Sequence, residues 1–541
     1  RRTGRPSNTL ALQEQDAIAA ALGDADADAL MARVASAGRS IAWISDEGWR
    51  RASVLLRGPL SRRAGRDRVI GPAITIRGGE VHVADTAALR NDPCTVLRVA
   101  ALTATAGATI SRSALDLLSA NASSLPDPWP PEARRLLADL LLAGPPAISV
   151  IEALDQRGLW TRILPEWAAV RSRPQRNAYH TFTVDRHLVE AAVRAAGLAG
   201  NVTRPDLLVV GTLLHDIGKG HPGDHTEVGM HLVRTMATRM GYEPAEVDTL
   251  VAMVEHHLLL PDVATRRDLD DPVTIQRTAA AVVNVERLKL VAALTEADSI
   301  ATGPAAWGPW KAGLVAALAE RVEHVLGGGE LADVAGEEFP TPDQRALMAA
   351  GERNIEAHDD LLTVIAPDRP GLFSRVAGVL ALHGLAVLRA RAWSSDDGMA
   401  INQWTIEVNK ERPTPWAKVI ADLDRALAGR LALQARLADK AKDYRRREKT
   451  ATPAKTAVSF DTAASTRSTV VDVQAPDAVG VLYRITRALS ELDLDIRAAR
   501  EQTVGSQVVD AFYVRDGDDA KIDDPDHLAE IERAVLGALG S

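Results

Sequence analysis

Histidine and aspartate side chains that could hold a divalent metal ion gather in the middle of this sequence. They occur in the short phrases TVDRH, LLHDIGK, GDHTEVG, VEHHLLL and LTEADSIATG. Imidazole and carboxylate groups are the ligands of borderline to hard divalent metals, and a helical bundle can direct several of them to one interior point. The residues that could serve such a centre are His187, His215, Asp216, His225, His256, His257 and Asp298.

The segment before His215 indicates how these side chains are positioned. The run DLLVVGTLL is almost wholly apolar, so it predicts a buried helix that carries His215 and Asp216 into a dry interior. Burying a carboxylate is costly unless it is paired or bound to a metal ion. A single histidine on an apolar helix is more often a core residue with satisfied hydrogen bonds, so the argument depends on the group.

The order of these phrases resembles the HD superfamily of metal-dependent phosphohydrolases. The resemblance implies a first metal site of His187, His215, Asp216 and Asp298, and a second site of His225, His256 and His257 that Asp216 bridges. Mixed histidine and carboxylate ligands suit Mn, Mg, Fe and Zn, and of these Mg²⁺ or Mn²⁺ is expected. A metal ion brings the pKa of its water towards neutrality and polarises a phosphoryl oxygen, so a phosphodiester can be hydrolysed without a protein nucleophile. The implied reaction is hydrolytic removal of a nucleotide.

Lys219 follows these ligands in the phrase HDIGK. Its ammonium group could contact a substrate phosphate, and we name it with Asp216 as a catalytic candidate. The alternative is that Lys219 lies at a solvated helix end.

A second informative feature is an internal repeat near the C-terminal end. The segment from Leu361 to Trp393 recurs from Thr469 to Gln502, with the same Asp-x-x-Gly phrase in both. The residue pattern of each copy predicts a strand, an Asp-x-x-Gly loop, an amphipathic helix and two further strands joined by a turn. The glycine leaves backbone N–H groups at the helix start free to bind a carboxylate, unless it only caps a turn.

The repeated pattern resembles the ACT domain, a βαββαβ module that senses small metabolites and usually works in pairs. The resemblance implies an amino-acid ligand, and glutamine is our expectation. The candidate ligand-binding residues are Asp368, Gly371, Asn402, Asp477, Gly480 and Asp510. The last strand of the first copy is expected near residues 458–460, after a charged, flexible connector at 439–455.

These features predict a multidomain protein that begins with mostly α-helical regions and ends with two α+β modules. The expected parts are a helical region at 1–175 with a hairpin at 74–83, and an α-helical HD domain at 176–330. A helical connector at 331–360 and ACT domains at 361–460 and 467–541 follow. The glycine pair at 78–79 marks the hairpin because a tight turn needs positive φ there.

Composition narrows the class of partner. Apolar residues make up 46% of the 541 residues and charged residues 25%, and no run is long and apolar enough to span a membrane. The net charge of −9 argues against nonspecific nucleic-acid binding, which favours a basic surface. Cys94 is the single cysteine and cannot form an internal disulfide. We therefore expect a cytoplasmic protein with protein or small-molecule partners.

An HD hydrolase followed by two ACT modules resembles the bifunctional enzymes that uridylylate and deuridylylate PII signalling proteins. The phrases YHTFTVDRH, LLHDIGKGHPGDHTEVG, EHHLL and APDRPGLFSRVAGVL carry this resemblance over nearly the whole chain. It implies modified PII as the partner and glutamine as the effector that favours nucleotide removal. Some related bacterial proteins adenylylate PII instead, so both UMP and AMP stay open as the group removed.

The family's nucleotidyltransferase signature, a glycine-rich turn followed by Ser-Asp-x-Asp, is not found here. The only nearby Asp-x-Asp phrase is GDADADAL, which is typical of a helix start. The chain begins with Arg1 rather than methionine, and GRPSNTLALQEQDAIA resembles the helices after the transferase half. We therefore expect a fragment without transferase activity.

Three alternatives remain open. A (p)ppGpp hydrolase also joins an HD domain to an ACT module, but it has an intervening domain and no tandem pair. Cyclic-dinucleotide phosphodiesterases share the phrase HDIGK. They also have a Gly-Tyr-Pro element, which is absent here because this chain continues after His257 as LLLPDVATRRD. The third is a catalytically inactive scaffold that binds amino acids and PII, against which the intact ligand set argues.

Overall fold

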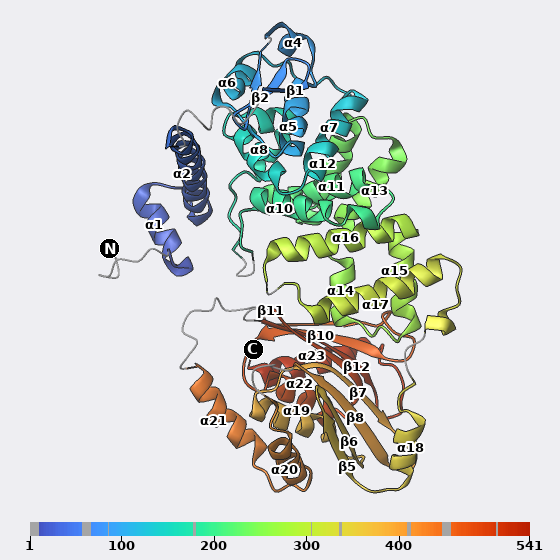
Figure 1. Ribbon diagram of the computed structural model, residues 1–541. Helices are drawn as coiled ribbons and strands as arrows, with labels where there is room; N and C mark the ends of the chain where they lie inside the picture. The colour runs from blue at the N-terminus through green and yellow to red at the C-terminus, as the bar shows by residue number, and fades with distance from the viewer. Residues whose placement is uncertain are drawn as a thin grey trace. The chain divides into compact units, whose positions relative to one another are not determined.

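The computed structural model describes two units, each with its own core. It describes residues 10–56, 67–84, 86–176, 180–304, 306–334, 338–407, 413–445, 456–504 and 507–540. Unit 1 comprises residues 1–260 and 282–313, and unit 2 comprises 261–281 and 314–541. Figure 1 shows the helical and sheet-containing parts that these ranges form. None of the described helices is both long and apolar enough to cross a membrane.

Unit 1 is mainly helical. A small sheet near its start contains the hairpin expected at 74–83, in which β2 pairs antiparallel with β3 and Gly78 and Gly79 have φ of 59° and 87°. Its elements are α1 (Gln15–Leu22), α2 (Ala27–Leu56), β1 (Arg68–Gly71), β2 (Ile74–Arg77), β3 (Glu80–Val83), α4 (Thr86–Asn91), α5 (Thr95–Thr105), β4 (Thr109–Ile110), α6 (Arg112–Asn121), α7 (Pro131–Leu142), α8 (Pro146–Asp155) and α9 (Leu159–Ile163).

Four helices of unit 1 form the bundle that positions the predicted metal ligands: α10 (Val184–Ala196), α11 (Pro205–Leu214), α13 (Pro244–Glu255) and α16 (Val285–Thr302). The helix α11 lies at the centre, and its residues Leu207 to Leu214 are all buried. The short 3-10 helix η4 (Ile217–Gly220) and α12 (His225–Arg239) follow it. A helix that is apolar on all sides over Leu207 to Leu214, apart from Thr212, is stable only when surrounded by other elements, and its burial confirms the buried helix expected before His215.

The chain crosses between the units in the α14–α15 segment (residues 259–282), in which α14 spans Leu259–Arg266 and α15 spans Pro272–Val282. Residues 261–281 belong to unit 2, although α13 before them and α16 after them belong to unit 1. The helix α17 (Pro309–Leu326) also passes from unit 1 into unit 2.

Unit 2 is built on an eight-stranded sheet in the order β5-β6-β8-β7-β11-β12-β10-β9. The two repeats meet where β7 pairs antiparallel with β11. The elements are α18 (Pro342–Ala349), β5 (Asn354–His358), β6 (Leu361–Pro367), α19 (Leu372–His383), β7 (Val387–Ser394), β8 (Met399–Ile406), α20 (Trp416–Leu427), α21 (Leu433–Arg445), β9 (Ala457–Asp461), β10 (Thr469–Pro476), α22 (Val481–Glu491), β11 (Asp495–Val504), β12 (Gln507–Arg515) and α23 (Pro525–Leu539).

One face of this sheet packs on the repeat helices. Val473 of β10, Ala499 of β11 and Phe512 of β12 share a core with residues of α19, α20, α22 and α23. Since side chains alternate between faces along a strand, the residues between them point to the opposite face. The two faces therefore have different surroundings.

Two sequence expectations are wrong in detail. The strand expected near 458–460 exists as β9, but it pairs with β10 of the second repeat instead of closing the first. The helical connector expected at 331–360 contains α18 but ends in strand β5, which pairs with β6. In both repeats the edge strand thus precedes its partner in the chain. Of the expected flexible connector, residues up to Arg445 are helical in α21, and 446–455 lie outside the described residues.

Candidate metal centre and effector pocket

The predicted metal ligands come together from several helices of the bundle. His187 lies on α10, His215 follows the last residue of α11, and Asp298 lies on α16. His187 and His215 are 1% and 0% exposed, so neither ring is solvated. The buried apolar α11 thus places His215 and Asp216 in the interior, as the sequence indicated.

The first ligand group is formed by His187, His215, Asp216 and Asp298. The His187 Nε2 atom lies 2.9 Å from Asp298 Oδ1 and 3.9 Å from Asp216 Oδ2. The His215 Nε2 atom lies 3.4 Å from Asp216 Oδ2 and 3.5 Å from Asp298 Oδ1. The structure therefore brings all four residues of the predicted first site together.

The second group forms on the other oxygen of Asp216. The Nε2 atoms of His225 and His257 each lie 3.8 Å from Asp216 Oδ1. A Cβ atom on Gly218 would lie 2.0 Å from the carbonyl oxygen of His225, so only glycine lets the start of α12 approach this closely. One carboxylate thus faces two histidine groups, as a bridging ligand would.

His256 is not brought into either group. Its Nε2 atom lies 3.9 Å from the Glu255 carboxylate, and its side chain is 18% exposed. The role predicted for His256 in the second site stays a prediction.

Hydrogen bonds to backbone carbonyls orient two of the imidazole rings. The Nδ1 atom of His215 lies 2.8 Å from the Thr212 carbonyl oxygen, and that of His257 lies 2.6 Å from the Val254 carbonyl oxygen. A proton on each Nδ1 atom leaves Nε2 with a free lone pair, which is the tautomer that a metal ligand requires.

The donor set fits a divalent metal ion. Ligand atoms of His187, His215 and Asp216 lie within 4.8 Å of one another, and so do those of Asp216, His225 and His257. Donors that share an ion at about 2.0–2.2 Å are within about 4.4 Å of each other, so the separations of 3.4–3.9 Å to Asp216 are suitable. His215 Nε2 and Asp216 Oδ1 are also buried without a conventional hydrogen bond.

The electrostatics of the site keep its carboxylates ionised. Burial by itself would raise the pKa of Asp216, but the neighbouring His215, Lys219 and His257 hold it well below its usual range. Burial would likewise raise the pKa of Asp298, but His215 and His187 hold it low. Burial would lower the pKa of His215, yet these two carboxylates raise it to about 10. The two ionised carboxylates thus already attract positive charge, which the His215 imidazole and the Lys219 ammonium supply in this structure.

Lys219 lies against the ligand set rather than at a solvated helix end. Its Nζ atom is 2.5 Å from Asp216 Oδ2 and 3.3 Å from Gln175 Oε1, and its side chain is 25% exposed. An ammonium group in this position borders the centre and can also reach towards solvent.

His180 is a neighbour of the centre that the candidate residues did not include. Its ring centroid lies 5.5 Å from that of His187, and its Nδ1 atom is buried without a conventional hydrogen bond. Burial and the nearby charges of Lys219 and His187 lower the pKa of His180 to about 4. Because His180 precedes α10 in an irregular stretch, no helical spacing relates it to His187, and only the phrase YHTFTVDRH could have drawn attention to it.

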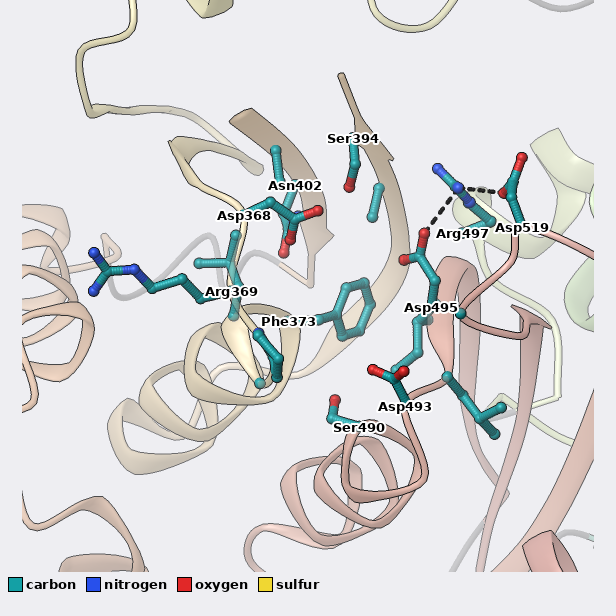
Figure 2. Close-up of a pocket in the computed structure, with 18 of the residues that line it drawn as sticks. Asp368, Arg369, Phe373, Ser394, Asn402, Ser490, Asp493, Asp495, Arg497 and Asp519 are labelled. Atoms are coloured by element: carbon teal, nitrogen blue, oxygen red, sulfur yellow. Dashed lines mark hydrogen bonds and ion pairs between the residues drawn. The ribbon is translucent and has the colours of Figure 1, made fainter. Parts of the chain in front are cut away.

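In unit 2, the first repeat's candidate residues line a cavity of about 370 Å³. Asp368 and Gly371 come from the loop before α19, and Asn402 comes from β8 (Figure 2). The second repeat contributes the other wall, where Arg497 pairs with Asp495 at 2.8 Å and Asp519 at 2.5 Å. This pocket combines backbone N–H groups at a helix start with many carboxylates.

The second repeat's candidate residues are not gathered in the same way. Gly480 heads α22 with φ of 78°, as Gly371 heads α19 with φ of 81°. Gly480 lines a separate cavity between α21 and α22, whose described lining does not include Asp477 or Asp510. Asp510 is fully buried on β12, opposite Glu501 of β11.

Comparison with known proteins agrees with this geometry. Residues 184–302 match the family model of the HD domain, and this stretch contains both ligand groups. The fold and the histidine–aspartate centre thus define an HD-domain protein with groups that can bind a metal ion.

Curated relatives of this chain carry one shared description, "bifunctional uridylyltransferase/uridylyl-removing enzyme". The protein of Streptomyces coelicolor is 40% identical over 99% of this chain and 72% of its own length. That of Mycobacterium tuberculosis is 39% identical over 100% of this chain and 68% of its own length, and that of Gluconobacter oxydans is 33% identical over 76% and 51%. This chain belongs to the family of bifunctional uridylyltransferase/uridylyl-removing enzymes.

Proposed function

We propose that this chain hydrolyses the phosphodiester bond that joins UMP or AMP to a modified PII signalling protein, using Mg²⁺ or Mn²⁺. The observation that carries the proposal is the pair of ligand groups that share Asp216 in the buried HD centre. The relatives' name, which includes uridylyl removal, supports UMP as the leaving group. The proposal is limited to nucleotide removal, because the HD centre is the site proposed to catalyse that reaction.

The residues of the centre have distinct roles in this proposal. His187, His215, Asp216 and Asp298 would hold one divalent ion, and Asp216, His225 and His257 a second. Bound ions supply Lewis acids that polarise a phosphoryl oxygen and acidify water. The Lys219 ammonium, which already contacts Asp216, would bind a non-bridging phosphate oxygen and so orient the phosphodiester. The apolar walls of α11 exclude bulk water from the ligand atoms.

The pocket of the first repeat is the proposed glutamine site, in a module of the ACT type. No side chain caps the backbone N–H groups at the start of α19, and such a helix start suits the carboxylate of an amino acid. Asn402 Oδ1 is buried without a conventional hydrogen bond, and carboxylates line the opposite wall, so amino and amide N–H groups find acceptors there. Glutamine bound in this pocket would favour nucleotide removal.

The decisive experiment measures nucleotide release from separately prepared uridylylated and adenylylated PII. Mn²⁺ or Mg²⁺ is supplied or chelated, and glutamine is added or omitted. We expect metal-dependent release that glutamine stimulates on the order of 5-fold or more, the usual lower size of an allosteric effect. The substrate that reacts identifies the nucleotide. Release from neither substrate, with metal shown to be bound, would refute the proposal and favour (p)ppGpp as the next substrate to test.

The sensor assignment has its own test. A valine at position 371 cannot easily adopt the positive φ of Gly371, so Gly371→Val should distort the loop and blunt the glutamine response. Gly480→Val is the matched variant in the second repeat, where the same φ is disturbed outside the proposed pocket. A full glutamine response in Gly371→Val would exclude this pocket as the glutamine site.

A further inference from the structure

The α14–α15 segment links the two proposed activities along the chain. It begins at Leu259, two residues after His257, and ends at Val282, before the helix α16 that carries Asp298. The HD family match covers it, yet its residues 261–281 belong to unit 2. A stretch of the hydrolase domain is therefore packed with the sheet of the repeats.

The sheet meets this segment with polar side chains on the face opposite the repeat helices. Asp472 lies between Val471 and Val473, Arg500 follows Ala499, and Tyr513 lies between two core residues of β12, so all three point away from the helices. Asp472, Arg500 and Tyr513 are 6%, 5% and 3% exposed. Buried charges on this face require partners of opposite charge.

The α14–α15 segment supplies these partners. Arg267 donates from both terminal nitrogens to the two Asp472 oxygens, at 2.9 Å each. Arg500 donates to Asp268 Oδ1 at 2.5 Å and to the Arg267 carbonyl oxygen at 3.3 Å. The backbone N–H of Asp268 donates to the Tyr513 hydroxyl at 2.7 Å. Bidentate and buried pairs of this kind hold one geometry, unlike exposed ion pairs.

The segment also contacts the seam where the two repeats join. Arg389 of β7 donates to Asp270 Oδ2 at 2.5 Å, and Arg389 is the register partner of Arg500 across the β7–β11 pairing. Asp268 and Asp270 therefore bind arginines from both repeats. A change in the spacing or twist of this seam would therefore move the arginine partners of both aspartates together.

The strands of this seam also line the proposed effector pocket on the helix side. Ala392 and Ser394 of β7 and Asp495 and Arg497 of β11 border the cavity. Arg389 and Arg500 lie on these same two strands and reach the α14–α15 segment from the other face. The sheet is thus a short physical connection between the pocket and the segment.

We propose that the α14–α15 segment is the coupling element of the protein. Ligand bound between the repeats alters the β7–β11 seam, and the Arg500–Asp268, Arg389–Asp270 and Arg267–Asp472 pairs carry this change into the segment. Its two ends lead directly to His257 and to the helix of Asp298, so the change alters the metal ligands. This inference rests on the proposed function, since it concerns how the effector acts on the hydrolase.

The test uses the full chain with Asp268→Asn and Asp472→Asn combined. These substitutions keep the side-chain shape but remove the charges that hold Arg500 and Arg267. The matched control is Asp424→Asn, which removes one partner of an exposed pair with Arg353 at 3.1 Å in the same unit. Three quantities are measured: glutamine binding by calorimetry, nucleotide release from modified PII, and Mn²⁺ affinity with and without glutamine.

In the wild type and in the control, we expect glutamine to change both release and Mn²⁺ affinity, because coupling between two sites is reciprocal. In the double variant, we expect glutamine to bind with an affinity within about threefold of wild type but to leave release and Mn²⁺ affinity within about twofold of their glutamine-free values. If the double variant is unfolded by circular dichroism, Tyr513→Phe removes only the hydrogen bond from Asp268 and should reduce the coupling partially.

The outcomes separate this inference from the proposed function. A wild-type protein that releases nucleotide without responding to glutamine would contradict the proposed effector. A wild-type protein that responds, together with folded variants that respond equally well, would overturn the coupling element and leave the proposed function standing.

Discussion

Two pairs of carboxylates, one in each unit, lie in opposite electrostatic surroundings, and each pair joins a fully buried residue to a half-buried one. In unit 1, imidazole groups and Lys219 hold the pKa values of Asp216 and Asp298 well below their usual range. In unit 2, burial raises the pKa values of Glu501 and Asp510 well above it, and the neighbouring charges come from other carboxylates, including Asp477. Burial is common to both pairs, so the neighbours decide whether each pair is charged.

The first repeat shows a third arrangement at the same sheet position. In the first repeat, Asn402 lies opposite Ala392 in the β7–β8 pairing. The equivalent pairing of the second repeat, β11–β12, places Asp510 opposite Glu501. A neutral amide thus borders the open pocket, and two carboxyl groups occupy the equivalent place in the other copy. The comparison indicates that the anionic pair in unit 1 is suited to bind cations, whereas burial in unit 2 raises the pKa of both carboxyl groups and so favours their neutral form.

The largest expected effect comes from removing two of the proposed metal ligands in unit 1. His215→Ala combined with Asp216→Ala should lower nucleotide release by about a thousandfold or more, because metal ions contribute several kcal/mol and roughly 1.4 kcal/mol is tenfold in rate. Metal content should fall in parallel. Asp248→Asn, at an exposed pair with Arg234 in the same unit, is the control. Unchanged release would disprove the metal-site assignment.

A smaller loss is expected from Lys219. Lys219→Met removes the ammonium group but spares every proposed metal ligand, so release should fall by about 10- to 100-fold, a typical effect of losing one group that supports a metal site. Bound metal should be retained, which separates this variant from the first. Lys219→Arg keeps the charge and should recover part of the activity. A wild-type rate of nucleotide release by Lys219→Met would show that Lys219 has a structural role and does not contribute to the reaction.

The smallest effect tests the protonated pair in unit 2. The folded pKa of Asp510 is raised above its unfolded value, so its favourable contribution is present below the unfolded pKa and is lost as pH rises. Asp510→Asn should therefore raise the melting temperature of unit 2 at pH 7 by at least about 2 °C, the shift that roughly 1 kcal/mol produces at this size.

The gain from Asp510→Asn should shrink as the pH falls below about 4 towards about 3, because only below the unfolded pKa of about 3.9 is Asp510 protonated in both the folded and unfolded states. The control is Asp523→Asn, because Asp523 is exposed. Calorimetric melts over this pH range measure both variants. Equal melting temperatures for wild type and Asp510→Asn at pH 7 would show that the raised pKa is not expressed in stability.

The sequence predicted those features that depend on the types and spacing of residues close together in the chain. The apolar run before His215 predicted a buried helix, and Gly78 and Gly79 predicted a hairpin, because both signals depend on neighbouring residues alone. The repeat around Asp368 and Asp477 likewise predicted two similar modules from internal similarity. The HD resemblance named His187, His215, Asp216 and Asp298 together as candidate metal ligands, and the structure places them together.

Other features depend on partners far away in the chain, and only the tertiary structure decided them. Strand β9 closes the second repeat because of pairing with β10, which its own residues do not specify. Glu501 lies beside Asp510 through strand register, and His180 reaches the centre from an irregular stretch before α10. The α14–α15 segment reads as part of the HD domain but binds the repeats through Asp268 and Arg267, since buried charges pair only once strands and helices have been assembled.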